Sequence, residues 1–206
     1  MNPTLANAAA NLKRHSSRRH NPLPTLWLMT DEHRLPNPKS VLATLPRGTG
    51  LILRHYGAPD RAVLARELAA ACRCRGIILV IAGDWRLAAD VGAAGLHLAE
   101  SLTRQGPPAG ARLWQRRSRR LLTVAAHGSC GLRRAAAVGA SAALLSPIFP
   151  TVSHPKRSPL GVMRAAGMIR RSPLAVIALG GVTRQTVRRL RGSGFAGIAG
   201  IGFALA

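Results

Sequence analysis

Short apolar runs recur along the whole chain, and polar or glycine-rich stretches separate them. Within each run the hydrophobicity is continuous rather than alternating, which is typical of parallel strands that are covered on both faces. The pattern predicts eight buried strands at Leu26–Met29, Leu51–Leu53, Ile77–Ile81, Gly95–Leu98, Leu121–Val124, Ala142–Leu145, Ala175–Leu179 and Gly197–Ile201.

Most stretches between these runs have the spacing of an amphipathic helix. Leu64, Leu68 and Cys72 would share one helical face, and Val187 and Leu190 would share another. Because strand and helix alternate eight times, the sequence favours a closed parallel barrel over an open sheet. We therefore expect an α/β protein with one domain, a (β/α)8 TIM barrel.

Three segments depart from this regular pattern. Residues 103–120 are rich in Gly, Pro and Arg and predict an atypical fourth helix. The sequence stops at Ala206, so we expect a truncated final helix, with the last barrel unit covered by a partner chain or by the N-terminal segment. Residues 1–22 show little apolar periodicity and are interpreted as a basic flexible tail that precedes a barrel over residues 23–206.

Arginine dominates the charge of this chain. Its formal net charge is +23, and 27 of the 30 basic residues are arginine, spread over almost every predicted helix. Such a spread favours solvated helix faces over a nucleic-acid site, which would cluster its cations. We do not expect nucleic acid as a partner, although binding of RNA stays open as an alternative function.

Cysteine usage and the length of the apolar runs bear on location. Cys72, Cys74 and Cys130 form neither a CxxC pair nor an even set, which suits a reducing compartment. No apolar run approaches the roughly 18 residues of a membrane span. We expect a cytoplasmic protein without a membrane partner, and a homo-oligomer remains open.

Glycine turns follow the seventh and eighth predicted strands. Gly180 and Gly181 come directly after one strand, and Gly200 and Gly202 flank Ile201 at the end of the other. In barrels of this class the loops after strands seven and eight commonly hold phosphate, because bare backbone amides can approach an anion closely. Tight turns alone would also explain these glycines.

Polar side chains also gather at the ends of other strands. The loop after the sixth strand, residues 146–156, carries hydroxyls, a histidine and a lysine. Arg54 ends the second strand, His97 lies in the fourth and His127 follows the fifth. All of them would face the mouth at which such barrels build their sites.

Five short segments, which include the sixth-strand loop and the Gly180–Gly181 turn, resemble the thiamine phosphate synthase family. This family includes the thiazole tautomerase TenI. The resemblance covers about residues 26–206, and its specific part is the sixth-strand loop together with the glycine turn after the seventh strand. The matching segments are residues 28–31, 53–54, 95–98, 146–151 and 178–182.

The resemblance implies a role for each matching residue. Gly180, Gly181, Ile201 and Gly202 would hold a thiazole phosphate, and Thr151, Ser153 and His154 would lie in the loop that encloses the substrate. Arg54 would face the pyrophosphate of the second substrate, and His97 would lie near its pyrimidine. The expected partner is therefore a phosphorylated thiazole.

The carboxylates that hold magnesium in the synthase are not matched. Gly83 stands where the family has its first magnesium aspartate, and the second would fall near Ser101 or Leu102. If the chain binds a metal at all, Asp84 and Glu100 are the candidate ligands, because magnesium requires carboxylate oxygens.

These departures decide between the reactions of the family. We expect no cofactor and lean toward a TenI-like tautomerase, in which His127 moves the ring proton near neutral pH. The first alternative is a thiamine phosphate synthase, which needs magnesium and couples a pyrimidine pyrophosphate to thiazole phosphate. The second alternative is a non-catalytic protein that binds a phosphorylated ligand or RNA.

Overall fold

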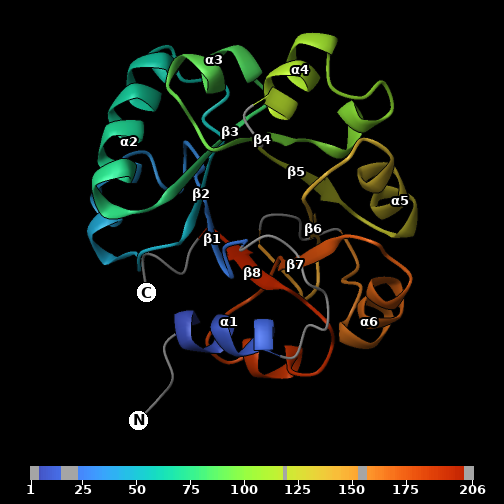
Figure 1. The fold of residues 1–206 in the computed structure, drawn as a ribbon. Helices are drawn as coiled ribbons and strands as arrows, with labels where there is room; N and C mark the ends of the chain where they lie inside the picture. Colours follow the sequence, from blue (N-terminus) through green and yellow to red (C-terminus); the bar gives the residue numbers. More distant parts are fainter. Residues whose placement is uncertain (1–4, 15–22, 118–119, 153–156, 202–206) are drawn as a thin grey trace.

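Eight parallel strands close into one barrel in the computed structural model of the chain (Figure 1). The structure describes residues 5–14, 23–117, 120–152 and 157–201. The strands are β1 (Leu26–Met29), β2 (Gly50–Leu53), β3 (Ile78–Ala82), β4 (Gly95–Leu98), β5 (Leu121–Ala126), β6 (Ala142–Leu145), β7 (Ala175–Leu179) and β8 (Gly197–Gly200). Each pairs with its sequence neighbour, and β8 pairs with β1 through Trp27 and Ala199, which confirms the predicted (β/α)8 barrel.

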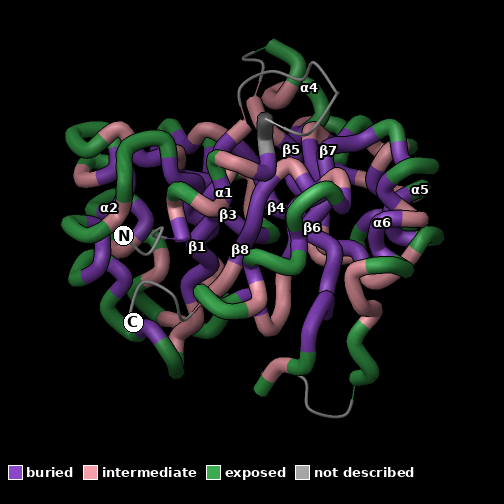
Figure 2. The backbone as a smooth tube through the Cα atoms, turned by 90° about the horizontal axis from the view of Figure 1, so that it is seen from below, coloured by how far each residue is buried: buried purple, intermediate pink, exposed green. Residues whose placement is uncertain are grey.

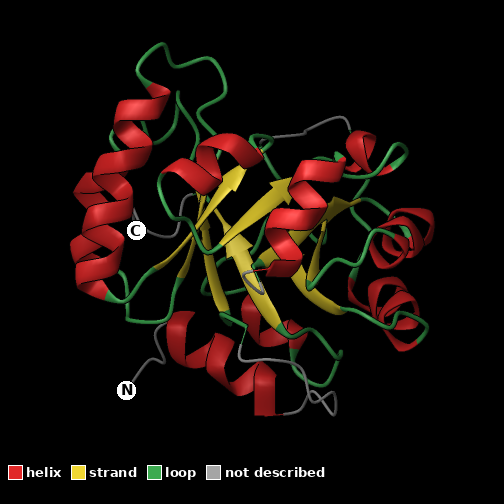
Figure 3. Cartoon of the chain, turned by 45° about the horizontal axis from the view of Figure 1, so that its top comes forward, coloured by secondary structure: helices red, strands yellow, loops and turns green. Residues whose placement is uncertain are grey.

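Helical segments surround the strands, as Figure 3 shows. The α-helices are α1 (Leu5–Arg14), α2 (Arg61–Arg75), α3 (Trp85–Asp90), α4 (Ala109–Arg117), α5 (Ser129–Ala137) and α6 (Val162–Arg170). Short 3-10 helices follow β1, β4 and β7: η1 (Pro38–Thr44), η2 (Glu100–Thr103) and η3 (Val187–Leu190). The expected helix around Val187 is thus a single 3-10 segment. No helix of the described residues is long and apolar enough to cross a membrane.

Continuous burial explains why these runs form strands. Four of the strands, β1, β2, β4 and β6, are buried at every position, and β7 is buried at its first four residues. Figure 2 shows this buried centre beneath exposed outer loops. Inside the barrel the Trp27 indole lies against Gly50, where an added Cβ would come within 2.2 Å of the ring, and its Nε1 donates to the Pro24 carbonyl.

The N-terminal segment corrects our sequence interpretation. Residues 5–14 form α1 rather than a flexible tail, and Leu5, Ala9 and Leu12 are buried. The helix contacts β8, β1 and η3, so it covers the seam at which the barrel closes. Of the two covers that we considered for the last barrel unit, a partner chain or the N-terminal segment, the structure shows the N-terminal segment against β8. Residues 1–4 and 15–22 lie outside the described part of the chain.

The region of the fourth helix, residues 103–120, contains the short helix α4, and its Ala111 is buried. Trp114 packs against the core with Arg120 stacked on its ring at 5.8 Å, and the Arg120 guanidinium donates to the Ala93 carbonyl. Arginine in this segment thus contributes to packing as well as to surface charge.

Candidate active site

A cavity of about 560 Å³ opens at the carboxyl ends of β7 and β8. That volume suits a small ligand. Its lining comes from the loops after β1, β6, β7 and β8 and from the first residue of α1. It consists of Leu5, Arg34, Phe149, Pro150, Thr151, Val152, Leu179, Gly180, Gly181, Val182, Thr183, Arg184, Gln185, Thr186, Arg189, Ala199, Gly200 and Ile201.

Two glycines bring the loops after β6 and β7 into contact. Gly180 and Gly181 have φ values of +89° and +65°, in the left-handed region. A Cβ added at Gly181 would lie 2.3 Å from the Pro150 carbonyl oxygen, so only glycine fits there. The Phe149 N–H donates to the Gly180 carbonyl at 3.0 Å, which links the two loops directly.

The loop after β7 is fixed by its own hydroxyls. The backbone N–H of Thr183 donates to Thr186 Oγ1, and the N–H of Thr186 donates to Thr183 Oγ1, at 2.8 and 3.2 Å. The Thr186 hydroxyl also donates to the Gly181 carbonyl at 2.9 Å. These three hydrogen bonds therefore fix the shape of the turn that follows β7.

The charge of this cavity is positive. Arg34, Arg184 and Arg189 line it, and none of its lining residues among the described ones is acidic. The Arg189 guanidinium stacks on the Phe149 ring at 5.3 Å from the centroid, a contact that holds the cation beside the cavity. Cations beside glycine turns suit a phosphate group.

Four residues that the sequence predicted for substrate binding meet in this cavity: Thr151, Gly180, Gly181 and Ile201. Ser153, His154 and Gly202 lie outside the described residues. Sequence reasoning missed Arg34, Arg184 and Arg189, because nothing in the pattern distinguishes them from the other arginines.

The remaining polar candidates, Arg54, His97 and His127, lie in or after strands of the same barrel but do not line this cavity. Arg54, half-buried, follows β2, and its backbone N–H donates to Thr30 Oγ1 at 2.9 Å. Burial raises the pKa of Asp31. Hydrogen bonds from the N–H groups of Arg34 and His33, together with the positive charge of Arg54, outweigh this effect, so the pKa is lowered.

His97 is a core residue in this structure. It is 3% exposed, and its Nδ1 lies 3.0 Å from the Thr123 hydroxyl of the neighbouring strand. Burial, with the charge of Arg54 adding to it, lowers the pKa of His97 to about 3. The imidazole is therefore neutral at physiological pH.

His127 follows β5 and is half-buried. Its Nδ1 lies 2.9 Å from the Ser146 carbonyl oxygen and 3.2 Å from the Ser146 hydroxyl. A carbonyl only accepts hydrogen bonds, so Nδ1 carries the hydrogen. The lone pair of the neutral ring is consequently on Nε2, the nitrogen that can take up a proton.

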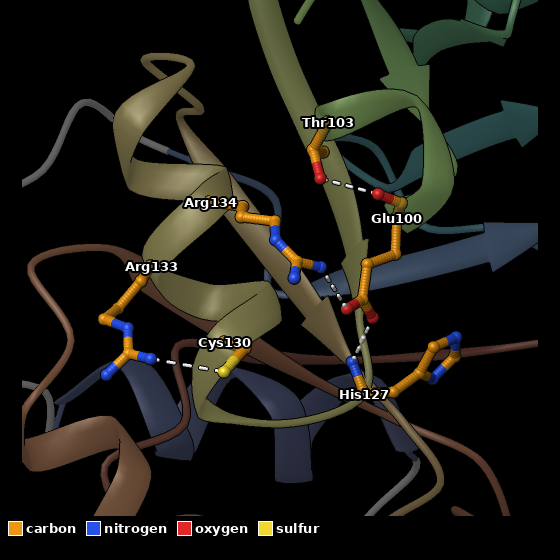
Figure 4. Close-up of polar contacts among 6 residues, drawn as sticks. All are labelled: Glu100, Thr103, His127, Cys130, Arg133 and Arg134. Atoms are coloured by element: carbon orange, nitrogen blue, oxygen red, sulfur yellow. Dashed lines mark hydrogen bonds and ion pairs between the residues drawn. The ribbon is translucent and has the colours of Figure 1, made fainter. Parts of the chain in front are cut away.

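Glu100 holds the backbone of His127 (Figure 4). Its Oε2 accepts from the His127 N–H at 2.8 Å, and its Oε1 lies 3.6 Å from Arg134 Nη1. Gly131 allows this approach, because a Cβ there would lie 2.9 Å from the carboxylate. In Figure 4 the imidazole points away from Glu100, so the carboxylate fixes the main chain and leaves the ring free to bond Ser146.

The described residues do not fit the magnesium that the synthase reaction implies. Gly83 offers no carboxylate, and the Asp84 side chain caps α3 by accepting from the Leu87 N–H at 3.0 Å. Glu100 is already held by Arg134 and the His127 N–H. Across the described chain, no three His, Cys, Asp or Glu residues are grouped so that they could hold a metal ion.

The sequence matches a family model described as thiamine monophosphate synthase over residues 26–203. It is 29% identical over 184 residues to the putative thiamine-phosphate synthase 2 of Aquifex aeolicus, covering 87% of this chain and 96% of that protein. It is 32% identical to the putative thiamine-phosphate synthase of Geobacter sulfurreducens, covering 85% and 84%.

Solved structures support the fold. A thiamine phosphate pyrophosphorylase from Pyrococcus furiosus superposes with a TM-score of 0.69 at 20% identity, covering 87% of this chain and 86% of that one. A second structure, titled native KDPGal, superposes with a TM-score of 0.56 at 16% identity and covers 91% and 85%. At these identities the likeness concerns the barrel alone.

Proposed function

Because this chain belongs to the thiamine monophosphate synthase family, we propose that it binds thiazole phosphate in the cavity at β7 and β8 and acts on it in thiamine biosynthesis. The observation that carries this proposal is the cavity itself. It joins the Gly180–Gly181 turn and three arginines to an apolar wall that includes Phe149, Leu179 and Ile201. A phosphate ester with a small aromatic ring needs both kinds of surface.

For the reaction, the names of the relatives favour coupling to a pyrimidine pyrophosphate over our TenI-like interpretation. In that reaction a bond forms between the two ring systems and pyrophosphate leaves. The cavity would hold the thiazole phosphate, and Arg54 at the end of β2 would offer a positive charge to the leaving group. We derive no step through magnesium, because the described carboxylates do not form its site.

Proton transfer on the thiazole is a second candidate, and the geometry of His127 favours it. The Ser146 carbonyl fixes the hydrogen on Nδ1, which leaves Nε2 as a base. Glu100 and Ser146 together hold this residue from two sides. A histidine with a defined tautomer suits general acid and base catalysis without a metal.

Turnover assays separate these reactions. The purified protein would be given thiazole phosphate and pyrimidine pyrophosphate, with magnesium and with EDTA, beside a tautomerase assay. We expect formation of thiamine phosphate. Tautomerase turnover without coupling would support proton transfer as the reaction instead. The absence of both activities would refute an enzymatic role.

Binding of thiazole phosphate tests the cavity independently of turnover. We expect Arg189→Gln to weaken binding by about tenfold, the scale of one charge-assisted hydrogen bond. Arg188→Gln is the matched control, because Arg188 is the adjacent exposed residue of η3 and does not line the cavity. Equal effects of the two variants would show that only the general charge of the protein matters.

A further inference from the structure

An arginine side chain lies against the end of β3. Arg61, the first residue of α2, donates from its Nη2 to the carbonyl oxygen of Ala82, the last residue of β3. Its guanidinium also stacks on the Tyr56 ring, 5.4 Å from the centroid. Two contacts therefore hold one positive charge against this strand end.

The neighbouring residue positions leave little room for a metal-binding side chain. Gly83 has a φ of +75°, and a Cβ added there would lie 3.2 Å from Tyr56 Cε1. A side chain at this position would therefore project against the tyrosine ring. Asp84, the next residue, uses a carboxylate oxygen to cap α3.

No carboxylate of the described residues forms an ion pair with Arg61. Its Nε is shielded from solvent and has no hydrogen-bond partner in the described part of the chain. A cation held in this state repels a divalent metal and attracts an anion.

We infer that Arg61, held at the end of β3 by Tyr56 and the Ala82 carbonyl, supplies the positive charge there in place of a divalent metal. The anion that this charge would meet belongs to the pyrophosphate class, and that identity rests on the proposed coupling reaction. The contacts of Arg61 with Ala82 and Tyr56 do not depend on that reaction. Anion binding at this strand end is thus independent of magnesium.

Calorimetric titration with inorganic pyrophosphate tests the inference. We expect the wild-type protein to bind pyrophosphate equally well in EDTA and in magnesium. Arg61→Gln should weaken binding by about tenfold or more, because a charge-assisted hydrogen bond is lost. Arg61→Lys keeps the charge and should lose less, which separates the effect of charge from a failure to fold.

Two control variants localise the effect. Arg75→Gln removes an exposed charge from the other end of α2 and should change affinity by less than about twofold. Arg189→Gln alters the cavity at β7 and β8. If Arg189→Gln weakens pyrophosphate binding and Arg61→Gln does not, the anion binds in that cavity and the inference is overturned.

Metal binding provides a readout that needs no substrate. Titration with Mn²⁺, followed by electron paramagnetic resonance, should show no saturable site in the wild-type protein. One stoichiometric Mn²⁺ that disappears in Asp84→Asn would overturn the inference, as would pyrophosphate binding that requires magnesium or is absent altogether. If pyrophosphate binding depends on Arg61 but no coupling occurs, the proposed reaction fails while this inference stands.

Discussion

The polar residues on the two sides of the barrel mouth make different kinds of contact. At β7 and β8, glycine turns, hydroxyls and arginines converge on one cavity. At β3 to β5, the carboxylates cap a helix or hold a neighbouring backbone, and a guanidinium lies at the strand end. One side therefore holds a cavity lined by glycines, hydroxyls and arginines, while on the other side the described acidic residues bond the backbone. A carboxylate close to an expected metal position is therefore not by itself a metal ligand, because Asp84 and Glu100 both accept hydrogen bonds from backbone N–H groups.

The largest loss of phosphate binding and of stability is expected from a substitution at Gly181. In Gly181→Ala the new Cβ would overlap the Pro150 carbonyl in a left-handed backbone conformation. We expect phosphate binding to be lost and the free energy of unfolding to fall by about 3 kcal/mol or more. Chemical denaturation and calorimetry would measure both.

Gly192→Ala is the matched control for that change. Gly192 has a similar φ of +71°, but an added Cβ would meet nothing within 4 Å. Its cost should be about 1 kcal/mol, from the backbone conformation alone. Equal losses in the two variants would show that the contact between the loops after β6 and β7 is unimportant.

The next effect concerns His127. If proton transfer is the reaction, His127→Asn should lower turnover by roughly 100-fold, the usual scale for a lost general acid or base, while thiazole phosphate still binds. Steady-state kinetics and calorimetry would separate the two quantities. A parallel loss of rate, affinity and stability would instead mean that the imidazole only ties its loop to the Ser146 carbonyl.

His97 should make the stability of the protein depend on pH. The unfolded histidine takes up a proton near pH 6.5, whereas the native one does so only near the lowered pKa of about 3. Its contribution to stability is therefore present above about pH 6.5 and declines as the pH falls toward 3, by up to about 1.4 kcal/mol per pH unit. Urea denaturation between pH 7 and pH 4 measures this slope.

The slope should flatten in a His97→Asn variant and persist in His33→Asn, which changes an exposed histidine. A wild-type slope that survives the loss of His97 would mean that other groups produce it.

The smallest effect should come from Asp84. Asp84→Ala removes the side-chain cap of α3 and should cost about 1 kcal/mol, the usual value for an N-cap. Adding magnesium should change the stability of the wild-type protein and of this variant equally. A magnesium-dependent stabilisation that only the wild-type protein shows would restore a metal role to this side of the mouth.

The strands were predictable because burial on both faces leaves an uninterrupted apolar signal. Four of them, β1, β4, β6 and β7, have the predicted bounds, and the others shift by one or two residues. α1 was missed although Leu5, Ala9 and Leu12 have helical spacing, since alanine is a weak hydrophobic signal in a polar, basic segment. Its burial depends on strands far away in the sequence.

The site was predictable only where backbone chemistry defines it. A glycine such as Gly181 is required because the neighbouring loop comes too close for a side chain, and its place directly after an apolar run was visible in the sequence. The roles of Arg61 and Glu100 depend on which neighbour each side chain meets in space, and sequence spacing does not carry that information. Two candidate metal ligands, Asp84 and Glu100, consequently turned out to bond backbone N–H groups.

The place of α1 has a consequence for how the chain acquires its structure. This helix precedes all eight strands in the sequence, yet it packs against η3 and β8, the last two elements that the structure describes. During synthesis Leu5, Ala9 and Leu12 therefore lack their final neighbours until η3 and β8 have left the ribosome. Closure of the barrel and docking of its first helix belong to one late, long-range event, the kind of step that slows folding and leaves apolar surface open to aggregation.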